Sequence, residues 1–404
     1  MSQADDIAAR LDDLPHRARY GLTEEDEAWR LRAAAFAADH VAPQARQADR
    51  DGRFDARLVP ALGQAGLLGP ALPAAVGGGG ASWMADCLVA EAIGAVDGSV
   101  RGFLAVQGGL VCAALARYAS DAQKAAWLPG LLRGERIGCY ALTEEGAGSD
   151  VGGMATRIRE DEDTLVIDGQ KVWITNGGVA DVALVFGSID PELKTRGLAC
   201  AIVPMDAEGV TREAMGGREL GHRASDHACL TFAGVRVPRA NRLGGPDEGF
   251  RVAMHGLEAG RLNVAAGAVG IQQACLDASV AFARHRRQFG RRIGDFQQVG
   301  ATLAEMAVDL ESTRLLTYHA ARLRDGGLDA AGAVSAAKLA ATEAAVQSAT
   351  KALQLHGSRG YTDELPIERH YRDAIALTIY EGASNIQRVI LARRLLGRDE
   401  GDPT

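Results

Sequence analysis

The stretch TLVIDGQKVWIT, residues 164–175, decides the fold class, because it interrupts a mainly helical pattern with a β pattern. Apolar and polar residues alternate on both sides of Asp168-Gly169, and an Asp-Gly pair between alternating segments predicts a β-hairpin. Other short β-like runs, separated by turn residues, follow in the region that begins near residue 138. These runs are DVALVFGSI (181–189), GLACAIVPM (197–205) and CLTFAGVRV (229–237).

Helical patterns lie on both sides of this β region. Thr23, with Asp26 three residues later, is a helix-start signal, and Pro43 is expected to end the first helix. Beyond residue 247, long apolar or Ala-rich faces predict a helical bundle. Its helices are expected near residues 250–284, 297–324, 328–355 and 366–396. The chain is therefore predicted to be an α+β protein with an N-terminal arm (1–20), an N-terminal α-helical domain (21–137), a middle β domain (138–245), a C-terminal four-helix bundle (246–397) and a tail (398–404).

The composition argues against several function classes. The chain has 404 residues, a net charge of −8 and an isoelectric point near 5.7, which does not favour nucleic acid as the main partner. No apolar run is expected to reach the length of a membrane span, and the N-terminus has no signal-peptide core. Six cysteines without a CxxC pair indicate a cytoplasmic protein with reduced thiols, and nine histidines form no metal-binding pattern.

Two segments of the β region carry residues suited to contact a ligand. In CYALTEEGAGSDVGG (139–153), glycines let a backbone approach a ligand closely and Ser149 can donate a hydrogen bond, although a turn-rich loop is the alternative. In QKVWITNGG (170–178), Trp173 and Thr175 share one face of a strand, where they can stack on an aromatic ring and bond its edge. Val172 and Ile174 are then expected in the core, and a half-buried Trp without a ligand is the alternative.

Two segments of the helical bundle are also candidates. RHRRQFGRRIGDFQQ (284–298) gathers arginines beside Phe289, and guanidinium groups bind phosphate oxygens well. This segment therefore suits a pyrophosphate, with a solvated charged face as the alternative. QLHGSRGYTDELPIERHYRDA (354–374) ends one helix and begins another near Pro366, so a plain helix–helix connection explains it equally well.

The stretch TIYEGASNIQRVILARRLLG (378–397) places one acid ahead of a helix. Ser384 with Gln387 three residues later predicts a capping box, so the helix is expected to begin at Ser384. Glu381 then lies just outside the helix, after an apolar stretch. An apolar site raises the pKa of a carboxylate, whereas a helix N-terminus opposes that shift. From the local pattern alone, Glu381 can be interpreted as an extra helix-capping acid.

Taken in order, the motifs resemble those of the acyl-CoA dehydrogenase family over roughly residues 21–397. They are ALTEEGAGSD, KVWITNGG, VRVPRANRLG, RRQFGRRIGDFQ, QLHGSRGY and IYEGASNIQ. The resemblance implies an N-terminal helical domain, a middle β-barrel-like domain and a C-terminal four-helix bundle, usually as a homotetramer. It also implies FAD as cofactor, an acyl thioester as substrate and an electron-transferring flavoprotein as electron acceptor. The expected activity is α,β-dehydrogenation of a short or branched acyl-CoA to the trans-2-enoyl thioester.

The resemblance also implies roles for individual residues. Glu381 matches the catalytic base, and Gly260 occupies the position from which some branches of the family supply the base instead. The residues expected to bind FAD, partly across a subunit interface, are Leu142, Thr143, Trp173, Thr175, Arg286, Gln297, Gln354, Gly357, Ser358, Ala383, Ser384 and Asn385. The residues expected to contact the acyl thioester are Ser149, Glu258, Arg261, Gly382 and Arg101.

The stretch VDGSVRGFLAVQGGLV (96–111) bears on the substrate. It resembles the matching region of glutaryl-CoA dehydrogenase and of acyl-carrier-protein dehydrogenases. Arg101 falls where the glutaryl enzyme binds a substrate carboxylate, but Gly94 replaces the accompanying acid and Gly102 the neighbouring Ser. An internal acid such as Asp97 is the alternative partner for Arg101.

Three other functions fit the same motifs. The first is the same reaction on an acyl group tethered to a carrier protein. The others are a flavin oxidase or monooxygenase and a non-catalytic assembly factor, and the presence of Glu381 argues against both.

Overall fold

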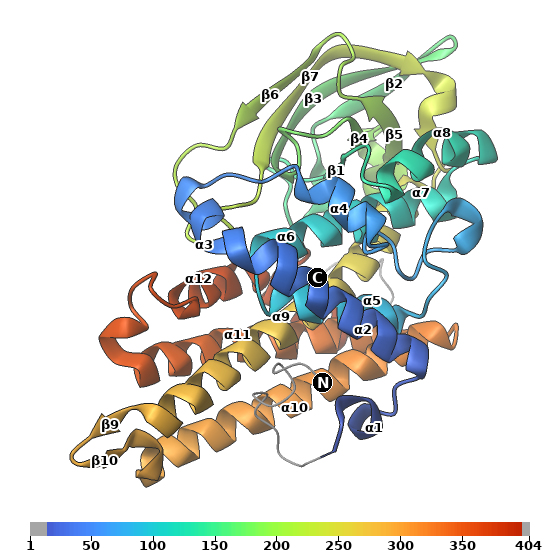
Figure 1. Ribbon diagram of the computed structural model, residues 1–404. Helices are drawn as coiled ribbons and strands as arrows, with labels where there is room; N and C mark the ends of the chain where they lie inside the picture. The colour runs from blue at the N-terminus through green and yellow to red at the C-terminus, as the bar shows by residue number, and fades with distance from the viewer. Residues whose placement is uncertain (1–13, 398–404) are drawn as a thin grey trace.

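The computed structural model describes residues 14–397, so the expected tail (398–404) and most of the expected arm (1–20) lie outside the described residues. An eight-stranded sheet lies at one end of the protein, a bundle of long helices at the other, and the N-terminal helices between them (Figure 1). The N-terminal helices are α1 (His16–Tyr20), α2 (Glu24–Phe36), α3 (Ala42–Asp51), α4 (Leu58–Gln64), α5 (Trp83–Gly94), α6 (Gly98–Leu104), α7 (Ala113–Tyr118) and α8 (Asp121–Leu132).

Local sequence signals explain where the first helix begins but not where it ends. The Thr23 side chain accepts a bond from the Asp26 N–H and the Asp26 carboxylate accepts from the Thr23 N–H, so the predicted start signal is confirmed. The prediction that Pro43 ends the helix is wrong. A π-helical turn, Ala37–Val41, leads directly into α3, and Pro43 lies in the first turn of α3, where its missing N–H breaks no helical bond.

The sheet of the middle domain combines antiparallel and parallel pairing. Its strands follow the order β6-β7-β3-β2-β4-β5-β8, and β1 pairs in parallel with β4. The strands are β1 (Gly138–Ala141), β2 (Arg157–Asp161), β3 (Thr164–Thr175), β4 (Val182–Ser188), β5 (Leu198–Pro204), β6 (Val210–Ala214), β7 (His227–Pro238) and β8 (Arg242–Leu243).

The predicted hairpin at Asp168-Gly169 is wrong, because β3 runs unbroken through both residues. Its pairing with β7 shifts register between Ile167 and Gly169, which is a β-bulge. A Cβ on Gly169 would come within 2.3 Å of Thr156 Oγ1, so close contact with the neighbouring chain requires glycine there. The turn that pairs β2 with β3 comes earlier, at residues 162–163.

The C-terminal bundle is built on α9, the longest helix, which packs against α5, α10 and α11. The predicted fourth helix (366–396) is two helices, because the chain leaves helical geometry at residues 378–383 and turns at Glu381. The bundle elements are α9 (Gly249–His285), α10 (Gln297–Asp325), α11 (Ala331–His356), α12 (Ile367–Leu377) and α13 (Ser384–Leu395), with a short hairpin of β9 (Arg287–Gln288) and β10 (Arg291–Arg292) between α9 and α10.

Two helical stretches are more apolar than the sequence analysis expected. Within the described residues, Gly98–Tyr118 and Gly249–His285 are long and apolar enough to cross a membrane by length and composition alone. Most of the apolar window of each stretch is buried against the rest of the protein, 78% and 67% respectively. Core helices pass the same test, so this apolarity is weak evidence for a membrane span.

Candidate active site

The turn between α12 and α13 has an unusual backbone. Glu381 has a φ of 53° and Gly382 a φ of 90°, so two successive residues are left-handed. Glycine adopts this conformation freely, but a residue with a side chain loses roughly 1–2 kcal/mol by doing so. Such a conformation persists only when its surroundings hold it in place.

Side chains from three helices hold this turn by its carbonyl oxygens. Arg261 Nε on α9 donates to the Glu381 carbonyl over 3.0 Å. Lys338 Nζ on α11 and Gln387 Nε2 on α13 both donate to the Gly382 carbonyl, each over 2.9 Å. We call these three side chains the carbonyl clamp.

The clamp also decides where the peptide N–H groups point. In a planar trans peptide the C=O and N–H bonds point in opposite directions. Because the carbonyls of Glu381 and Gly382 face the clamp, the N–H groups of Gly382 and Ala383 face away from it. Within residues 14–397, the N–H groups of Glu381, Gly382 and Ala383 donate to no backbone carbonyl. They are therefore available to an oxygen acceptor.

The Glu381 carboxylate has one oxygen that nothing in the described chain satisfies. Oε2 is buried and has no hydrogen-bond partner within residues 14–397. It lies directly against Gly260 on α9, where an added Cβ would come within 2.0 Å of it. Burial raises the pKa of Glu381 to about 7, against the opposing effect of the positive charges of Arg101, Lys338 and Arg261. A carboxylate with that pKa suits a general base near neutral pH.

Arg101 is buried beside this carboxylate. It lies on α6 with 1% of its surface exposed, and its Nη2 donates to the Tyr380 hydroxyl. Its guanidinium also lies 5.6 Å from the centre of the Tyr380 ring, a cation–π distance. Nη1 of Arg101 has no hydrogen-bond partner within residues 14–397. Burying a guanidinium with one unpaired NH2 group costs free energy unless a ligand accepts a hydrogen bond from that group.

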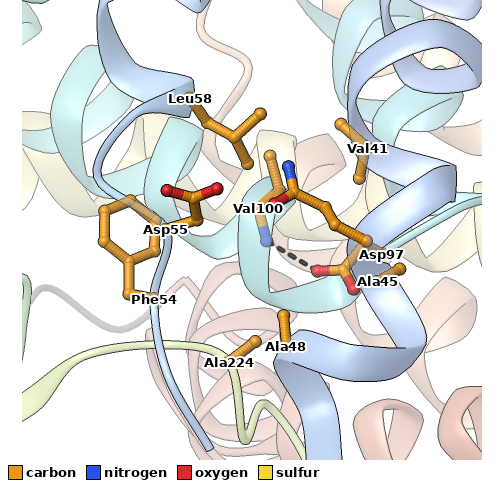
Figure 2. A pocket seen from close by; sticks show the side chains of 10 residues that line it. Val41, Ala45, Ala48, Phe54, Asp55, Leu58, Asp97, Val100 and Ala224 are labelled. Carbon is orange, nitrogen blue, oxygen red and sulfur yellow. Dashed lines mark hydrogen bonds between the residues drawn. The ribbon is translucent and has the colours of Figure 1, made fainter. Parts of the chain in front are cut away.

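The prediction that an internal acid such as Asp97 pairs with Arg101 is wrong. Asp97 is the N-cap of α6 and accepts a 2.9 Å bond from the Val100 N–H (Figure 2). Its other oxygen lies 3.9 Å from Arg369. A carboxylate at the N-cap points along the helix axis, whereas Arg101 projects from the helix side. The cavity beside Asp97 holds only about 10 Å³, room for about one water, and is no ligand site.

Two of the residues predicted to bind FAD, Leu142 and Thr143, directly follow β1 and are bonded to β3. The Val172 N–H donates to the Thr143 carbonyl over 2.9 Å, and the buried Lys171 ammonium donates to the Leu142 carbonyl over the same distance. Lys171 also binds the Glu144 carboxylate at 2.7 Å, which fixes the loop after β1. Leu142 is buried and Thr143 is partly buried.

Trp173 and Thr175 face outward from β3, and Val172 and Ile174 lie in the core as predicted. Trp173 has a φ of 58° within a second bulge and 54% of its surface is exposed. The bulge therefore leaves about half of the Trp173 surface open to contact with a ligand.

A cleft of about 400 Å³ opens at the start of α13. The predicted helix start at Ser384 is confirmed, but the capping box is wrong: Ala383 is the N-cap, and Gln387 turns back to the Gly382 carbonyl instead. Ser384 Oγ has no hydrogen-bond partner within residues 14–397. The cleft is lined by Glu343, Val346, Gln347, Ile375, Thr378, Ala383, Ser384 and Asn385.

The arginine-rich segment lies at the far end of the bundle (Figure 1). Stacked rings of Phe282 and His356, 4.5 Å apart, join the ends of α9 and α11 there. Gly260 lies on α9, and Arg286 directly follows the last residue of this helix. The 26 residues between them span roughly 39 Å at 1.5 Å per residue. The structure therefore does not bring this end to Glu381 within one chain. The predicted ligand residues exposed at this end are Arg286, Gln297, Gln354, Gly357 and Ser358.

The predicted thioester contacts fall into two groups. Arg261, Gly382 and Arg101 surround Glu381, as described above. Ser149 is exposed on the loop after β1, and the Glu258 carboxylate lies 3.9 Å from Arg324. Within residues 14–397, neither Ser149 nor Glu258 makes a hydrogen bond or an ion pair with Glu381.

Three protein-family models match successive parts of the chain between residues 23 and 396. They are the acyl-CoA dehydrogenase N-terminal domain at residues 23–135, the middle domain at 139–235 and the C-terminal domain at 247–396. This chain belongs to the acyl-CoA dehydrogenase family. It is an oxidoreductase with the three-domain acyl-CoA dehydrogenase fold, and FAD is the cofactor of the family.

Curated relatives of this acyl-CoA dehydrogenase include enzymes for small acyl groups. The mouse (Mus musculus) mitochondrial short-chain specific acyl-CoA dehydrogenase is 39% identical over 93% of this chain and 91% of its own length. The rat (Rattus norvegicus) mitochondrial short/branched chain specific enzyme is 36% identical over 93% of this chain and 86% of its own length.

Solved structures agree with this assignment. Butyryl-CoA dehydrogenase from Megasphaera elsdenii superposes with a TM-score of 0.90 at 32% identity, covering 93% of this chain and 99% of that one. A structure described as the electron transferring flavoprotein of Acidaminococcus fermentans gives 0.91 at 34%, covering 94% and 99%. A glutaryl-CoA dehydrogenase from Mycobacterium smegmatis in complex with FADH2 gives 0.91 at 29%, covering 96% and 98%.

The residues present fit an FAD molecule. The uncovered face of Trp173 suits stacking on an aromatic ring system, and the unpaired Ser384 hydroxyl lies in a cleft of sufficient size. The exposed arginines at the far end of the bundle suit a pyrophosphate.

Sequence reasoning missed Lys338, Tyr380 and His222 around the site. Lys338 carried a readable signal, because it is the one charged residue among Val334, Ala341 and Ala345 on the buried face of α11. A lysine in register with core residues must have a buried partner. Tyr380 and His222, whose rings meet edge to face at 5.6 Å, gave no comparable signal because their contact joins distant segments.

Proposed function

We propose that this acyl-CoA dehydrogenase converts short or branched acyl-CoA thioesters to trans-2-enoyl thioesters, with Glu381 as the base. The observation that carries the proposal is the buried Glu381 Oε2 without a partner, at a pKa of about 7, beside free backbone N–H groups. An acid that served only to cap α13 would instead accept bonds from the first N–H groups of that helix.

The chain's own groups account for the proton transfer. The α-proton of a thioester is weakly acidic, so its removal needs a base aimed at Cα and donors on the carbonyl oxygen. Glu381 supplies the base, and the N–H groups of the left-handed turn supply donors. FAD, when bound, accepts the hydride that leaves Cβ. The proposed FAD contacts within one chain are Leu142, Thr143, Trp173, Thr175 and residues 383–385.

The surroundings of Glu381 favour a small acyl group. Arg101 and His222 are buried, Tyr380 is partly buried, and together they form a polar layer on the α6 side of the carboxylate. A long alkyl chain packed there would offer no hydrogen bond to the buried, unpaired Nη1 of Arg101, which is unfavourable. The short-chain and short/branched-chain relatives support the same choice.

The test is anaerobic reduction of the purified flavoprotein by a panel of acyl-CoAs. Butyryl-CoA and isobutyryl-CoA should bleach the oxidised flavin bands rapidly, and octanoyl-CoA should do so slowly. Glu381→Gln should keep the flavin and lose the bleaching. Colourless protein that gains no flavin absorbance with added FAD, or equal rates at all chain lengths, would contradict the proposal.

A polar-ended acyl group is a second candidate substrate, favoured by the unpaired Nη1 of Arg101. An acid cannot be placed at Gly94 to pair with it, because a Cβ there would come within 2.8 Å of the Gly267 backbone. Arg101→Met should then lower kcat/KM for glutaryl-CoA by roughly 10- to 150-fold, the value of a charged hydrogen bond. Because Arg101 also lowers the pKa of Glu381, both substrates must be compared near pH 9, where the base is ionised in both proteins. Equal loss with butyryl-CoA at that pH would assign Arg101 to structure.

The proposal also covers the number of subunits, the electron acceptor and the carrier of the acyl group. We propose a homotetramer in which Arg286 and Gln297 bind the FAD of a neighbouring subunit. Arg286, at the C-terminal end of α9, lies roughly 39 Å from Gly260, and Gln297 begins α10 after the hairpin that follows Arg286. We also propose an electron-transferring flavoprotein as acceptor, supported by the Acidaminococcus relative. Rates of flavin reduction by butyryl-CoA and by butyryl-carrier protein, compared at equal concentration, show which carrier the enzyme uses. Mass photometry measures the number of subunits in the assembly.

A further inference from the structure

We infer that Lys338 is a positioning residue of the dehydrogenation, which holds the Gly382 carbonyl and keeps the neighbouring Glu381 ionised. The inference rests on the proposed role of Glu381 as base. It concerns a residue on α11 that makes no contact with the reacting atoms as far as the described residues show. Three observations lead to it: the burial of Lys338, its hydrogen bond and the backbone that it supports.

Lys338 is buried where a lysine has little reason to be. None of its surface is exposed, and its neighbours on the same face of α11 are small uncharged residues, namely Val334, Ser335, Ala341 and Thr342. Its ammonium makes a 2.9 Å bond to the Gly382 carbonyl and no ion pair within residues 14–397. A buried ammonium that served packing alone would be replaced at lower cost by Leu or Met, which fill the same space without desolvation.

The carbonyl that Lys338 holds belongs to the catalytic turn. Glu381 is left-handed at a cost, and Gly382 follows it in the same conformation. If the Gly382 peptide rotated, its oxygen would turn toward the substrate side and the Ala383 N–H would turn away from it. Gln387 donates to the same oxygen over 2.9 Å, so the carbonyl is doubly held, once by a neutral donor and once by a charged one.

The charge of Lys338 also acts on the base itself. Glu381 is faced by Arg101 from α6, Arg261 from α9, Lys338 from α11, Tyr140 from β1 and its neighbour Tyr380. The cations lower the pKa of Glu381 against the effect of burial. Burial conversely lowers the pKa of Lys338 to about 8, with Glu381 opposing that change. Each charge therefore stabilises the other: Lys338 favours the ionised form of Glu381, and Glu381 favours the charged form of Lys338.

The experiment separates the two actions of Lys338 with two variants. Lys338→Met removes the charge and the bond. Gln387→Leu removes a neutral donor from the same carbonyl, together with a longer 3.5 Å bond from Gln387 to the Glu381 carbonyl, and changes no charge. The rate of flavin reduction by butyryl-CoA is measured from pH 5.5 to 9.5. The protonation of Glu381 is followed independently by infrared difference spectroscopy, with Glu381→Gln identifying its carboxyl band. This second readout needs no turnover, so it tests Lys338 even if butyryl-CoA is not a substrate.

Lys338→Met should move the midpoint of the acid limb, and of the infrared titration, upward by roughly one pH unit. Its limiting rate should fall about 10-fold, because the Gly382 carbonyl loses one of its two donors. Gln387→Leu should lower the limiting rate without moving the midpoint, and Lys338→Arg should restore the midpoint. Lys351→Met is the matched control, since Lys351 lies on the same helix and pairs with Glu305 at 3.1 Å near the bundle end.

A purely structural role predicts different results. In that case Lys338→Met would lower the melting temperature or the FAD content in proportion to the activity, and both midpoints would stay unchanged. That outcome overturns the inference. So does a failure of both Lys338→Met and Lys338→Arg to fold, which would assign Lys338 to folding alone.

Discussion

The turn at Glu381 and the arginine-rich end of the bundle satisfy their polar groups in opposite ways. At the turn, the carbonyl clamp of Arg261, Lys338 and Gln387 satisfies both carbonyl oxygens from within one chain. At the bundle end, Arg287 lies opposite Arg292 across the hairpin β9–β10, and like charges that face each other across strands repel. The first region, which we call the closed region, surrounds the Glu381 carboxylate with side chains of the same chain. The second, which we call the open region, leaves its arginine side chains exposed, where they could bind an anion.

This difference shows which part of the site a single chain can complete. Within residues 14–397, the turn leaves without a partner one Glu381 oxygen and the N–H groups beside it, which the proposed reaction would use, together with Ser384 Oγ and Gln387 Oε1. The bundle end leaves whole guanidinium groups exposed, including Arg286, which has no ion pair within residues 14–397. The first region should therefore control the chemical step, and the second should control the retention of the cofactor.

Glu381→Gln tests the closed region and should have the largest effect. The amide keeps the size of the side chain but cannot accept the α-proton, so flavin reduction by butyryl-CoA should fall at least ~10²–10⁴-fold. Stopped-flow absorbance measures the rate, and the ratio of flavin to protein should stay unchanged. A near wild-type rate would mean that the base lies elsewhere.

The pH dependence of the wild-type enzyme should give the next largest effect. The base works only when ionised, and its pKa is raised to about 7. The rate should therefore rise with pH through about 7 and level off above it, and fall roughly tenfold for each unit well below it. A flat profile from pH 5.5 to 9.5 in single-turnover reduction would show that the Glu381 carboxylate is not the group that titrates.

The order of the domains was predictable from the sequence, because periodicity is a local property. Long Ala-rich faces indicated α9, α10 and α11, and alternation indicated β3, β4, β5 and β7. The strand β2 (RIRED) was missed, because four of its five residues are charged and only Ile158 enters the core. The prediction of a hairpin at Asp168-Gly169 was wrong because bulges and turns use the same residue types. Only the close contact with Thr156, which appears in the fold, identifies this glycine as part of a bulge.

The site was predictable only in part, because its parts are joined by contacts between distant segments. The motif around Glu381 identified the acid. It could not show the support from Lys338, 43 residues earlier, or Arg261, 120 residues earlier. Gln387 was read as a capping partner of Ser384, since the local spacing fits that role. In the fold, the left-handed turn places the Gly382 carbonyl next to the Gln387 amide. Gln387 therefore donates to that carbonyl instead of forming the capping box.

Arg286→Ala tests the open region and should leave the chemical step alone. Loss of one charge-assisted contact to a phosphate oxygen costs roughly 1.5–3 kcal/mol, so FAD affinity should fall about 10- to 150-fold. Isothermal titration of the apoprotein measures the affinity, and the reduction rate at saturating FAD should match the wild type. If the reduction rate falls instead, the two regions are not independent.

The smallest effect is expected from Arg359→Ala, at the same end of the bundle. Arg359 pairs with Glu364 at 3.1 Å, but both side chains are more than half exposed, so the pair adds little to stability. Its guanidinium is already neutralised by that carboxylate, whereas Arg286 has no such partner among the described residues. FAD affinity should therefore change less than twofold at 0.15 M salt, and the melting temperature should stay within about 1 °C of the wild type. A loss of affinity equal to that of Arg286→Ala would mean that this end attracts the cofactor through its total positive charge rather than through one placed guanidinium. The affinities of both variants should then converge on the wild type as the salt concentration is raised, because diffuse attraction is screened.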